Sequence, residues 1–290
     1  MWIKNSQQQG EALVFAGVLL WGLFPVVTKL SFNALPPMMS LAIGTLISAL
    51  MFGVIVWYQG HGRSLLVVKA LRPILLATLI NGIIYYSFVF AGIARTTAGN
   101  SGIMLLTEVF FTFLILTILG KERFDLTHFL GAVCVVAGAV LALFPGKLLV
   151  NSGDLLIIAG CIFPPLGNSY SREARTLVSS TVILFWRNLI GGVLLCIAAF
   201  AIYGVPDEAA LKSSSLLLLL NGLVILGISK LFWIEAIHRI SISKAISLSS
   251  MSPLFTLLFA YMLLGEIPAW YQLGALLPMG AGIYLLTRPR

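Results

Sequence analysis

The sequence predicts an all-α polytopic membrane protein, on the basis of its composition, the length of its apolar runs and the short segments between them. Of the 290 residues, 59% are hydrophobic and only 10% are charged, and the mean hydropathy is +1.03. A soluble globular chain carries roughly 25% charged residues to keep its surface hydrated. The apolar excess must therefore face a lipid bilayer, which is the first expected partner of this protein.

A helix that crosses the bilayer needs about 20 mostly apolar residues. Dividing the chain at polar residues, Gly and Pro predicts ten such spans joined by short connections. The first five are 11–31 after Gly10, 37–58 at Pro37, 73–93 at Pro73, 99–119 at Gly99, and 126–144 after the charged segment 121–123. The second five are 153–171 at Gly153, 180–203 before Gly204, 214–236 after Lys212, 244–264 before Gly265, and 270–287 before Arg288.

The distribution of Lys and Arg predicts which ends of the spans face the cytoplasm, because cytoplasmic loops carry an excess of cations. If the N-terminus is cytoplasmic, ten spans return the C-terminus to the same side. Cytoplasmic segments then hold twelve cations and the opposite side four, while Arg187 and Lys230 lie inside spans. The twelve are Lys4, Arg63, Lys69, Arg72, Lys121, Arg123, Arg172, Arg175, Arg239, Lys244, Arg288 and Arg290, and the four are Lys29, Arg95, Lys147 and Lys212. We therefore expect both termini in the cytoplasm.

The net charge of +8 does not indicate a nucleic-acid-binding protein, because the cations stand singly or in twos rather than in a basic block. Cys134, Cys161 and Cys196 lie inside apolar runs without a CxxC pair, which is typical of small buried hydrophobic side chains. We therefore expect no metal site, no cofactor and no nucleic-acid partner. The first apolar run has only Lys4 before it and no small-residue cleavage site after it, which indicates a retained span rather than a signal peptide.

The two halves of the chain match each other at a nearly constant offset, which predicts an internal repeat. At an offset of 143 residues, Gly10-Glu11 matches Gly153-Asp154, Ala16-Gly17 matches Ala159-Gly160, and Lys29 matches Arg172. At an offset of 144, Arg95 matches Arg239, Phe111-Thr112 matches Phe255-Thr256, and Glu122 matches Glu266. Each half holds five spans, an odd number, so the second half must enter the membrane from the opposite side. The predicted domains are thus residues 1–147 and 148–290, two inverted five-helix repeats.

Several short motifs resemble a known family. Leu-Gly-Lys-Glu at 119–122 and Leu-Gly-Glu at 264–266 each precede a Gly-rich span, and Leu20-Trp21-Gly22 is followed by Lys29. Together with Ser252-Pro253 in the ninth span, they resemble the ten-helix EamA-type branch of the drug/metabolite transporter superfamily, over essentially the whole chain. The chain departs from the family pattern in the fourth span, where the usual Pro is absent and Thr107-Glu108-Val109 stands opposite Met251-Ser252-Pro253 of the second half.

The resemblance implies an integral, multi-pass protein of a bacterial inner (plasma) membrane that moves amino acids, drugs or related small metabolites. It also implies a cavity lined mainly by the first, third, fourth, sixth, eighth and ninth helices. Two inverted repeats around such a cavity are typical of alternating access, in which one site opens to each side of the membrane in turn.

Glu108 is the first candidate for the substrate site, because it lies about nine residues into the fourth span, near the middle of the membrane. A charged side chain at this depth costs a few kcal/mol unless the protein interior satisfies it. Glu108 could bind a substrate ammonium group or carry a coupling proton. The alternative is a structural carboxylate paired with a neighbouring helix.

Four other charged residues have similar alternatives. Arg187, in the seventh span, could hold a carboxylate in bidentate fashion, partner Glu108, or extend to the headgroups. Lys230, deep in the eighth span, could line the cavity, whereas Glu235 in the same span is expected near the interface. Lys29, near the outer end of the first span, could gate the cavity or extend to the lipid surface.

Uncharged polar and aromatic residues on the same spans complete the predicted substrate site. Tyr85 and Tyr86 are neighbours, which point about 100° apart on a helix and so do not face one direction. Pro164-Pro165 is the strongest predicted helix kink, because two consecutive residues lack backbone donors. The residues predicted to shape the cavity are Trp21, Asn81, Tyr85, Tyr86 and Asn168.

One motif is similar to that of an enzyme family, but its sequence context does not favour catalysis. Gly99-Asn100-Ser101-Gly102 is similar to the GxSG motif of intramembrane serine proteases, and a nucleophilic serine needs a base within hydrogen-bond distance. The predicted topology puts Ser101 near the outer surface and His61, His128 and His238 near the cytoplasmic one. No nucleotide-binding motif is present. We therefore expect no catalytic residues and no enzyme activity.

The sequence thus predicts a secondary-active transporter of a small polar or amphipathic metabolite, with a zwitterion such as an amino acid favoured and proton coupling through Glu108 as an option. The alternative function is a lipid-handling flippase or scramblase, which would need a polar groove open sideways to lipid. The Gly-rich fifth and tenth spans suit either tight packing within one chain or the seam of a homodimer.

Overall fold

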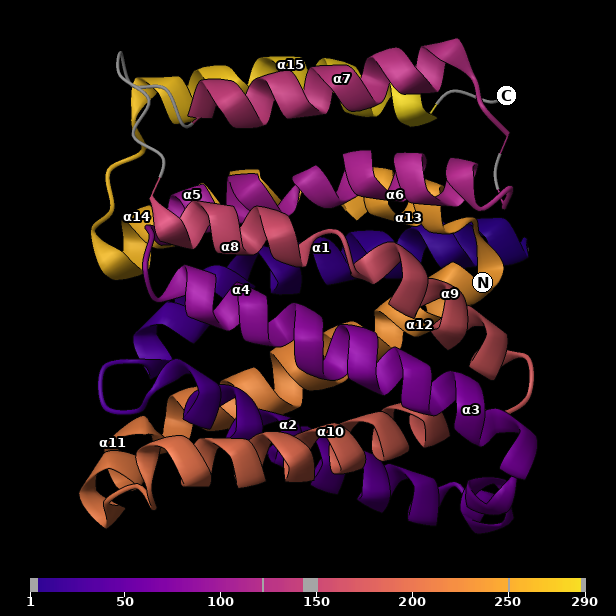
Figure 1. Ribbon diagram of the computed structural model, residues 1–290, viewed down its shortest axis with the longest axis vertical. Coiled ribbons are helices and arrows are strands. Elements are labelled where there is room, and N and C mark those ends of the chain that lie inside the picture. The colour runs from indigo at the N-terminus through magenta and orange to yellow at the C-terminus, as the bar shows by residue number, and fades with distance from the viewer. Residues whose placement is uncertain (1–4, 122, 143–150, 250, 288–290) are drawn as a thin grey trace.

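The computed structural model describes residues 5–121, 123–142, 151–249 and 251–287, and every regular element in these ranges is helical. Lys4, Glu122, Lys147, Arg288 and Arg290 of the sequence predictions lie outside these ranges. The helices lie roughly side by side and are stacked along the longest axis of the molecule (Figure 1). Six helical segments are long and apolar enough to cross a membrane, and Leu126–Ala142 and Ser252–Leu264 are shorter apolar helices. These features confirm the predicted helical fold with several apolar spans.

Helices occupy each of the ranges predicted for the first half, starting at residues that favour a helix N-terminus. The Asn5 side chain accepts a hydrogen bond from the Gln7 amide at the start of the first helix, and Pro37 occupies the first turn of the second. The elements are α1 (Ser6–Ser31), α2 (Pro37–Tyr58), η1 (His61–Leu66), α3 (Val68–Ala77), η2 (Thr78–Tyr85), α4 (Tyr86–Ile93), α5 (Ala98–Leu105), α6 (Thr107–Ile118) and α7 (Leu126–Ala142). Three of these, α3, η2 and α4, form one continuous helical segment.

Helices also occupy the ranges predicted for the second half. The Asn151 side chain caps its first helix by accepting from the Asp154 amide. The elements are α8 (Ser152–Gly160), α9 (Pro164–Arg175), α10 (Ser180–Tyr203), α11 (Glu208–Leu219), η3 (Leu220–Ile228), α12 (Ser229–Arg239), α13 (Ile242–Ser249), α14 (Ser252–Leu264) and α15 (Trp270–Thr287). The elements α11, η3 and α12 form one continuous segment.

Irregular segments occur at corresponding places in the two halves. Both η2 and η3 are π-helical. The break between α5 and α6 at Leu106 has its counterpart between α13 and α14, next to Met251. The predicted kink at Pro164-Pro165 is confirmed as a break, because α8 ends at Gly160 and α9 begins at Pro164. A proline at the first helical position leaves no donor unpaired, which explains why α9 begins there.

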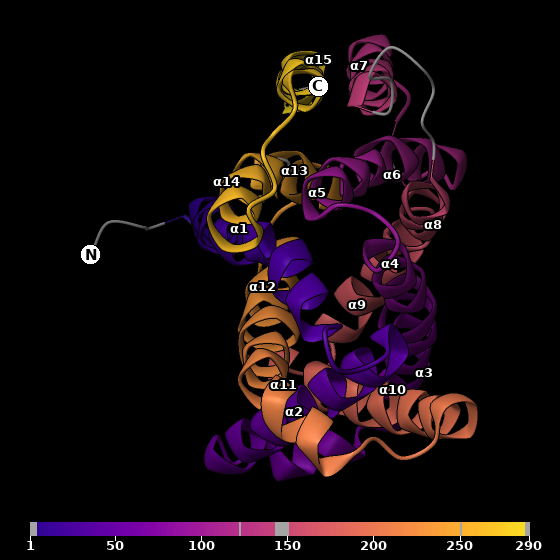
Figure 2. The ribbon, with the colours of Figure 1, turned by 90° about the vertical axis from the view of Figure 1, so that its left-hand side faces the viewer.

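Two helix pairs form the ends of the molecule, with α7 against α15 at one end and α2 against α10 at the other (Figures 1 and 2). In the α7–α15 pair, a Cβ atom added at Gly131 would lie 2.7 Å from the Gly282 carbonyl oxygen, and one at Gly138 would lie 2.7 Å from the Ala275 carbonyl oxygen. Only Gly permits this approach of the two backbones. These glycines of the fifth and tenth spans therefore serve packing within the chain.

Between the two end pairs, α1 packs against α12 and α14, while α4 and α3 pack against α8 and α9. The apolar core fills most of this central region, with Phe24 and Phe90 among its fully buried side chains. Polar side chains gather in one part of it, where the helices are interrupted.

Candidate functional site

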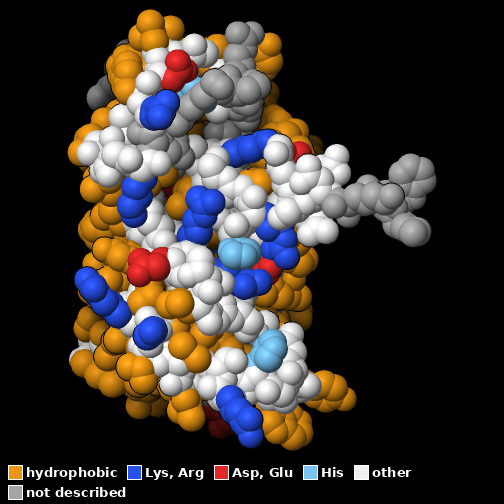
Figure 3. Space-filling model, turned by 90° about the vertical axis from the view of Figure 1, so that its right-hand side faces the viewer, with side chains coloured by type: hydrophobic (Ala, Val, Ile, Leu, Met, Phe, Trp, Pro, Cys, Tyr) orange, Lys and Arg blue, Asp and Glu red, His pale blue; other side chains and the backbone are white. Residues whose placement is uncertain are grey.

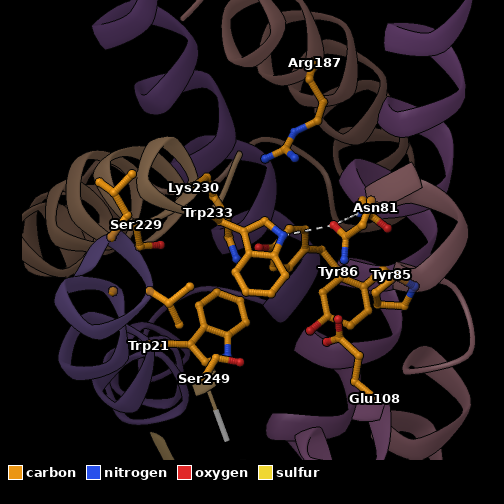
Figure 4. Close-up of a pocket in the computed structure, with 15 residues that line it drawn as sticks. Trp21, Asn81, Tyr85, Tyr86, Glu108, Arg187, Ser229, Lys230, Trp233 and Ser249 are labelled. Carbon is orange, nitrogen blue, oxygen red and sulfur yellow. Dashed lines mark hydrogen bonds between the residues drawn. The ribbon is translucent and has the colours of Figure 1, made fainter. Parts of the chain in front are cut away.

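A cavity lies in the central region of the molecule, between helices of both halves of the chain. It receives side chains from α1, η2, α4, α6, α9, α10, α12 and α13 (Figure 4). All eight residues that the sequence suggested for the substrate site line it: Trp21, Asn81, Tyr85, Tyr86, Glu108, Asn168, Arg187 and Lys230. Sequence reasoning missed the remaining lining residues, which are Leu13, Val14, Gly17, Pro164, Ser229, Trp233 and Ser249.

Three charged side chains meet in this cavity. Arg187 and Lys230 are buried, with 5% and 8% of their surface exposed, and Glu108 is partly buried. The Lys230 ammonium lies 3.2 Å from the centroid of the Trp21 ring and 5.4 Å from that of Tyr86, which are cation–π contacts. Glu108 and Lys230 also attract each other electrostatically. None of the ion pairs formed between described residues includes any of these three groups.

The break between α5 and α6 determines where Glu108 lies. Because α6 begins at Thr107, Glu108 falls in the first turn of that helix. This break occurs although the fourth span lacks the proline of the family pattern. Because of it, Glu108 lies at a helix start in the interior of the molecule.

Two amides and an indole form a hydrogen-bonded group on another wall of the cavity. The Asn81 amide nitrogen of η2 donates to Asn168 Oδ1 of α9 at 3.1 Å, and Trp233 Nε1 of α12 donates to the same oxygen at 3.1 Å. Gly167 makes this possible, since a Cβ atom at that position would overlap the Asn81 amide. The three residues therefore join three helices around the cavity (Figure 4).

Tyr85 and Tyr86 both line the cavity, although neighbouring side chains on a helix diverge. Their ring centroids lie 5.0 Å apart with an angle of 53° between the planes. Tyr85 ends the π-helical segment η2, and a π-helix has more residues in each turn than an α-helix, so successive side chains diverge less. A single wall of the cavity thus accommodates both rings.

An aromatic cluster extends from the cavity residues Trp21 and Tyr86. The ring of Phe24 stacks on Trp21 at 4.9 Å and contacts Phe90 at 6.0 Å, and Phe90 in turn contacts Phe32 at 5.9 Å. Along α1 the order is cavity residues, then Phe24, then Lys29, so the cluster lies between the cavity and the helix end. We call Phe24, Phe32, Tyr86 and Phe90 the aromatic plug.

Beyond the aromatic plug, an ion pair joins three segments. The Lys29 ammonium of α1 contacts Glu266 Oε1 at 3.0 Å and donates to the Thr96 carbonyl oxygen at 2.7 Å. Glu266 also accepts hydrogen bonds from the backbone amides of Ala98 and Gly99, both at 3.2 Å, and so caps α5. We call this group the outer clasp, because it lies farther from the cavity than the aromatic plug. It consists of Lys29, Thr96, Glu266 and the start of α5, so Lys29 is paired outside the cavity.

Ion pairs at the opposite ends of the helices involve the remaining sequence candidates. Glu235 of α12 accepts hydrogen bonds from Arg175 of α9, at 2.8 Å, and from Arg239. The Lys244 ammonium lies 2.6 Å from Glu11 and joins α13 to α1. Glu235 is thus a structural partner of two arginines at the end of the bundle.

The Ser101 hydroxyl of the protease-like motif donates to the Thr97 carbonyl oxygen at 2.8 Å, one helical turn earlier. Cys161 and Cys196 are buried, and Cys134 is partly buried. Among the described residues, no three His, Cys, Asp or Glu side chains gather in a way that could hold a metal ion. These groups take ordinary structural positions in helices.

The sequence profile of the EamA-like transporter family matches the chain twice, over residues 8–144 and 151–288. The chain belongs to the EamA-like transporter family. Its cavity, aromatic plug and outer clasp are thus features of a transporter, a class of protein that acts on small molecules within a lipid bilayer.

Two relatives are themselves named only as transporters. A protein of Bacillus subtilis (strain 168), named the uncharacterized transporter YoaV, is 24% identical over 281 residues, which cover 94% of this chain and 95% of that one. An uncharacterized transporter of Methanothermobacter thermautotrophicus is 28% identical over 219 residues, covering 73% of this chain and 63% of its own length. A solved crystal structure with 18% sequence identity has the same fold, with a TM-score of 0.77 and 97% coverage of both chains.

The family and the structure together identify this EamA-like protein as an integral, multi-pass protein of the inner (plasma) membrane. They confirm the predicted membrane location and family, and they place a polar cavity in its centre.

Proposed function

We propose that this protein is a secondary-active transporter of a small polar or amphipathic metabolite, working by alternating access. The observation that carries the proposal is the central cavity, where Glu108, Arg187 and Lys230 lie among aromatic rings in the interior of the helical bundle. Ionisable groups within membrane-spanning segments are costly and commonly mark substrate or ion pathways. A transporter gives these groups a function that a purely structural helical bundle would not require.

The substrate class that suits this cavity best is an amino acid or a related zwitterion. An acid and two bases supply partners for both ends of a zwitterion, and the rings of Trp21, Tyr86 and Trp233 supply apolar surface for its body. Glu108 is the proposed contact for a substrate ammonium group and the proposed carrier of a coupling proton.

Alternating access requires two related halves, and several observations support the proposed inverted repeats 1–147 and 148–290. The family profile matches each half separately. The π-helical segments η2 and η3 and the breaks after α5 and α13 lie at corresponding positions. We propose ten spans, which the observed elements support, since α3–η2–α4, α5–α6, α8–α9, α11–η3–α12 and α13–α14 each occupy one predicted range.

The proposed orientation places both termini in the cytoplasm. In support of it, α1 begins and α15 ends on the same side of the bundle (Figure 1), and Lys and Arg side chains gather on the face that this side presents (Figure 3). Cytoplasmic faces of membrane proteins carry such an excess. In this orientation the aromatic plug and the outer clasp close the cavity toward the outside.

Uptake in proteoliposomes tests the proposal. Purified protein would be reconstituted and supplied with a radiolabelled amino-acid mixture, with and without an imposed proton gradient. We expect uptake by the wild type, at least a tenfold loss in Glu108→Gln as one charge-assisted contact is removed, and normal uptake by the control Glu208→Gln, whose exposed carboxylate lies in the first turn of α11. Uptake by Glu108→Gln with wild-type rate and pH dependence would remove Glu108 from the mechanism.

The same vesicles also test the lipid-handling alternative. A flippase or scramblase needs polar groups that face the lipid, whereas Arg187 and Lys230 are buried. We therefore expect no acceleration of the translocation of a fluorescent phospholipid. Lipid translocation without amino-acid uptake would replace the proposed function by the alternative.

A further inference from the structure

Arg187 is held rigidly with its guanidinium group directed into the cavity (Figure 4). Its side-chain stem packs against Gly82 of η2, where an added Cβ atom would lie 3.6 Å from Arg187 Cγ. The next residue, Asn188, donates to Ser48 Oγ of α2 at 2.8 Å, and Ser48 donates to the Leu226 carbonyl oxygen of η3 at 3.1 Å. These contacts anchor the part of α10 that carries Arg187 to the surrounding helices.

Within the described part of the chain, Arg187 has no carboxylate partner, and its buried Nε atom has no hydrogen-bond acceptor. Other cations of this protein do have such partners: Lys29 contacts Glu266, Lys244 contacts Glu11, and Arg175 contacts Glu235. The interior of a membrane protein is the place where an unpaired guanidinium costs most. Arg187 therefore stands apart from these cations.

No ion pair joins Glu108 to Arg187 among the described residues, and Glu108 interacts electrostatically with Lys230 instead. Arg187, in contrast, repels Lys230. Arg187 and Glu108 also enter the cavity from opposite sides, with the rings of Tyr86 and Trp233 between them (Figure 4). The one acid of the cavity is thus balanced by one base, and the charge of Arg187 is left over.

We propose that Arg187 forms a carboxylate-binding subsite, separate from the Glu108–Lys230 pair, and that the transported substrate carries a carboxylate that binds there. The planar guanidinium fork matches a carboxylate with two parallel hydrogen bonds, and Nε is one of the donors that such a fork offers. The proposal rests on the proposed function, since it concerns the substrate of the same cavity. It assigns Arg187 to the substrate rather than to Glu108.

Three probes that share one apolar body test the subsite. Leucine carries a carboxylate and an ammonium group, 4-methylpentanoate only the carboxylate, and 3-methylbutylamine only the ammonium group. Each would be added at millimolar concentration to the detergent-purified full-length protein, and the apparent melting temperature recorded, since a ligand of the folded state raises it. Acetate serves as a carboxylate without an apolar body.

We expect leucine, 4-methylpentanoate and acetate to stabilise the wild type. In Arg187→Gln the apparent affinity for 4-methylpentanoate should fall at least about tenfold, because a hydrogen-bonded charge is lost. Arg187→Lys should recover only part of it, as the charge remains but the fork does not. The control Glu208→Gln, at an exposed site in α11, should keep the wild-type response to 4-methylpentanoate. Equal affinity in wild type and Arg187→Gln, or a wild type that responds to the amine but to neither carboxylate, overturns the proposal.

The melting temperature of the protein without ligand is a second measurement. A structural role of Arg187 and a ligand-binding role predict different changes of this temperature in Arg187→Gln. If Arg187 is an unpaired cation waiting for a ligand, Arg187→Gln without ligand should melt at the same temperature as the wild type or higher. If Arg187 stabilises the fold through a partner, the substitution should lower the melting temperature, which contradicts the subsite.

These experiments distinguish a failure of the proposed subsite from a failure of the proposed transport function. Binding of 4-methylpentanoate through Arg187 without amino-acid uptake in vesicles would leave the subsite standing and remove the transport function. Uptake that persists in Arg187→Gln with an unchanged KM for leucine would leave the transport function standing and remove the subsite.

Discussion

At the scale of single residues, the cavity contains three charged side chains that would be costly to expose to the bilayer core. Each of them has a different environment. Glu108 lies at a helix start, Lys230 lies on the face of Trp21, and Arg187 has no partner among the residues described. The second arrangement lowers the cost of burying a charge, through the ring quadrupole. The third leaves that cost in place until a ligand binds.

The Lys230→Met substitution should show that Lys230 and Glu108 act as a pair. Removing the ammonium leaves the Glu108 carboxylate without its balancing charge, so we expect a lower apparent melting temperature and loss of transport. In the double variant with Glu108→Gln, part of the stability should return, with a non-additive term of about 1 kcal/mol or more. Thermal unfolding of the four proteins measures this term, with Lys212→Met, at an exposed site in α11, as the control. Additive effects would show that the two groups act independently.

Gly167→Ala should disrupt the hydrogen-bonded group of Asn81, Asn168 and Trp233. The new methyl group would overlap the Asn81 amide, so α9 must move away from η2 and the cavity wall must open. We expect a loss of transport larger than the loss of stability. The matched control is Gly274→Ala in α15, where an added Cβ atom has no neighbour within 4 Å. Similar transport rates for the two variants would show that this wall is not needed.

Sequence reasoning found the charged and amide residues of the cavity because each is unusual inside an apolar span. It missed Trp233 and Ser249, which have nothing unusual in their sequence context. A tryptophan in a span is ordinary, and only its hydrogen bond to Asn168 gives it a place in the site. The pairing of Lys230 with Trp21 depends on two helices far apart in sequence, so no local pattern could indicate it.

At the scale of elements, the interruptions of the helices matter more than their lengths. The break at Pro164-Pro165 could be predicted, because missing donors are visible in the sequence. The break at Leu106 could not be predicted, since the fourth span has no proline there. The π-helical segments η2 and η3 are likewise invisible in the residue pattern, although π-helical turns are frequent at functional sites.

Glu266→Gln should weaken the outer clasp. The neutral side chain loses the ion pair with Lys29 and the charge that favours the start of α5. Under alternating access, the balance should then shift toward outward-open protein. In a cysteine-free background, Phe32→Cys should react faster with an external, membrane-impermeant maleimide when Glu266→Gln is present. The exposed control Glu208→Gln should leave the rate unchanged, and an equal rate in both would exclude a closing role for the clasp.

At the scale of the whole molecule, composition and apolar run length were enough to predict a helical membrane protein, because the cost of exposing backbone groups to lipid leaves few alternatives. The order of the helices in space, in contrast, could not be predicted from the sequence. The pairing of α7 with α15 and of α2 with α10 joins segments from different halves, and it depends on glycines whose partners only the folded chain reveals.

The proposed topology predicts which loops are reachable from outside the cell. A cysteine at Gly62, in η1, should be protected in intact cells, and one at Ser213, in α11, should react with an impermeant maleimide, because both sites are exposed and lie at opposite ends of the spans. Permeabilising the cells should make Gly62→Cys reactive as well. The reverse pattern would invert the orientation, and labelling of both in intact cells would rule out the proposed spans.

The aromatic plug has a pharmacological consequence. In the proposed orientation, the fully buried rings of Phe24 and Phe90 lie between the cavity and the outside, so a blocker that competes for the cavity would approach from the cytoplasm. Such a compound would inhibit inside-out vesicles at once and intact cells only after crossing the bilayer. Drug design against this conformation would therefore favour molecules that permeate membranes over large, charged ones.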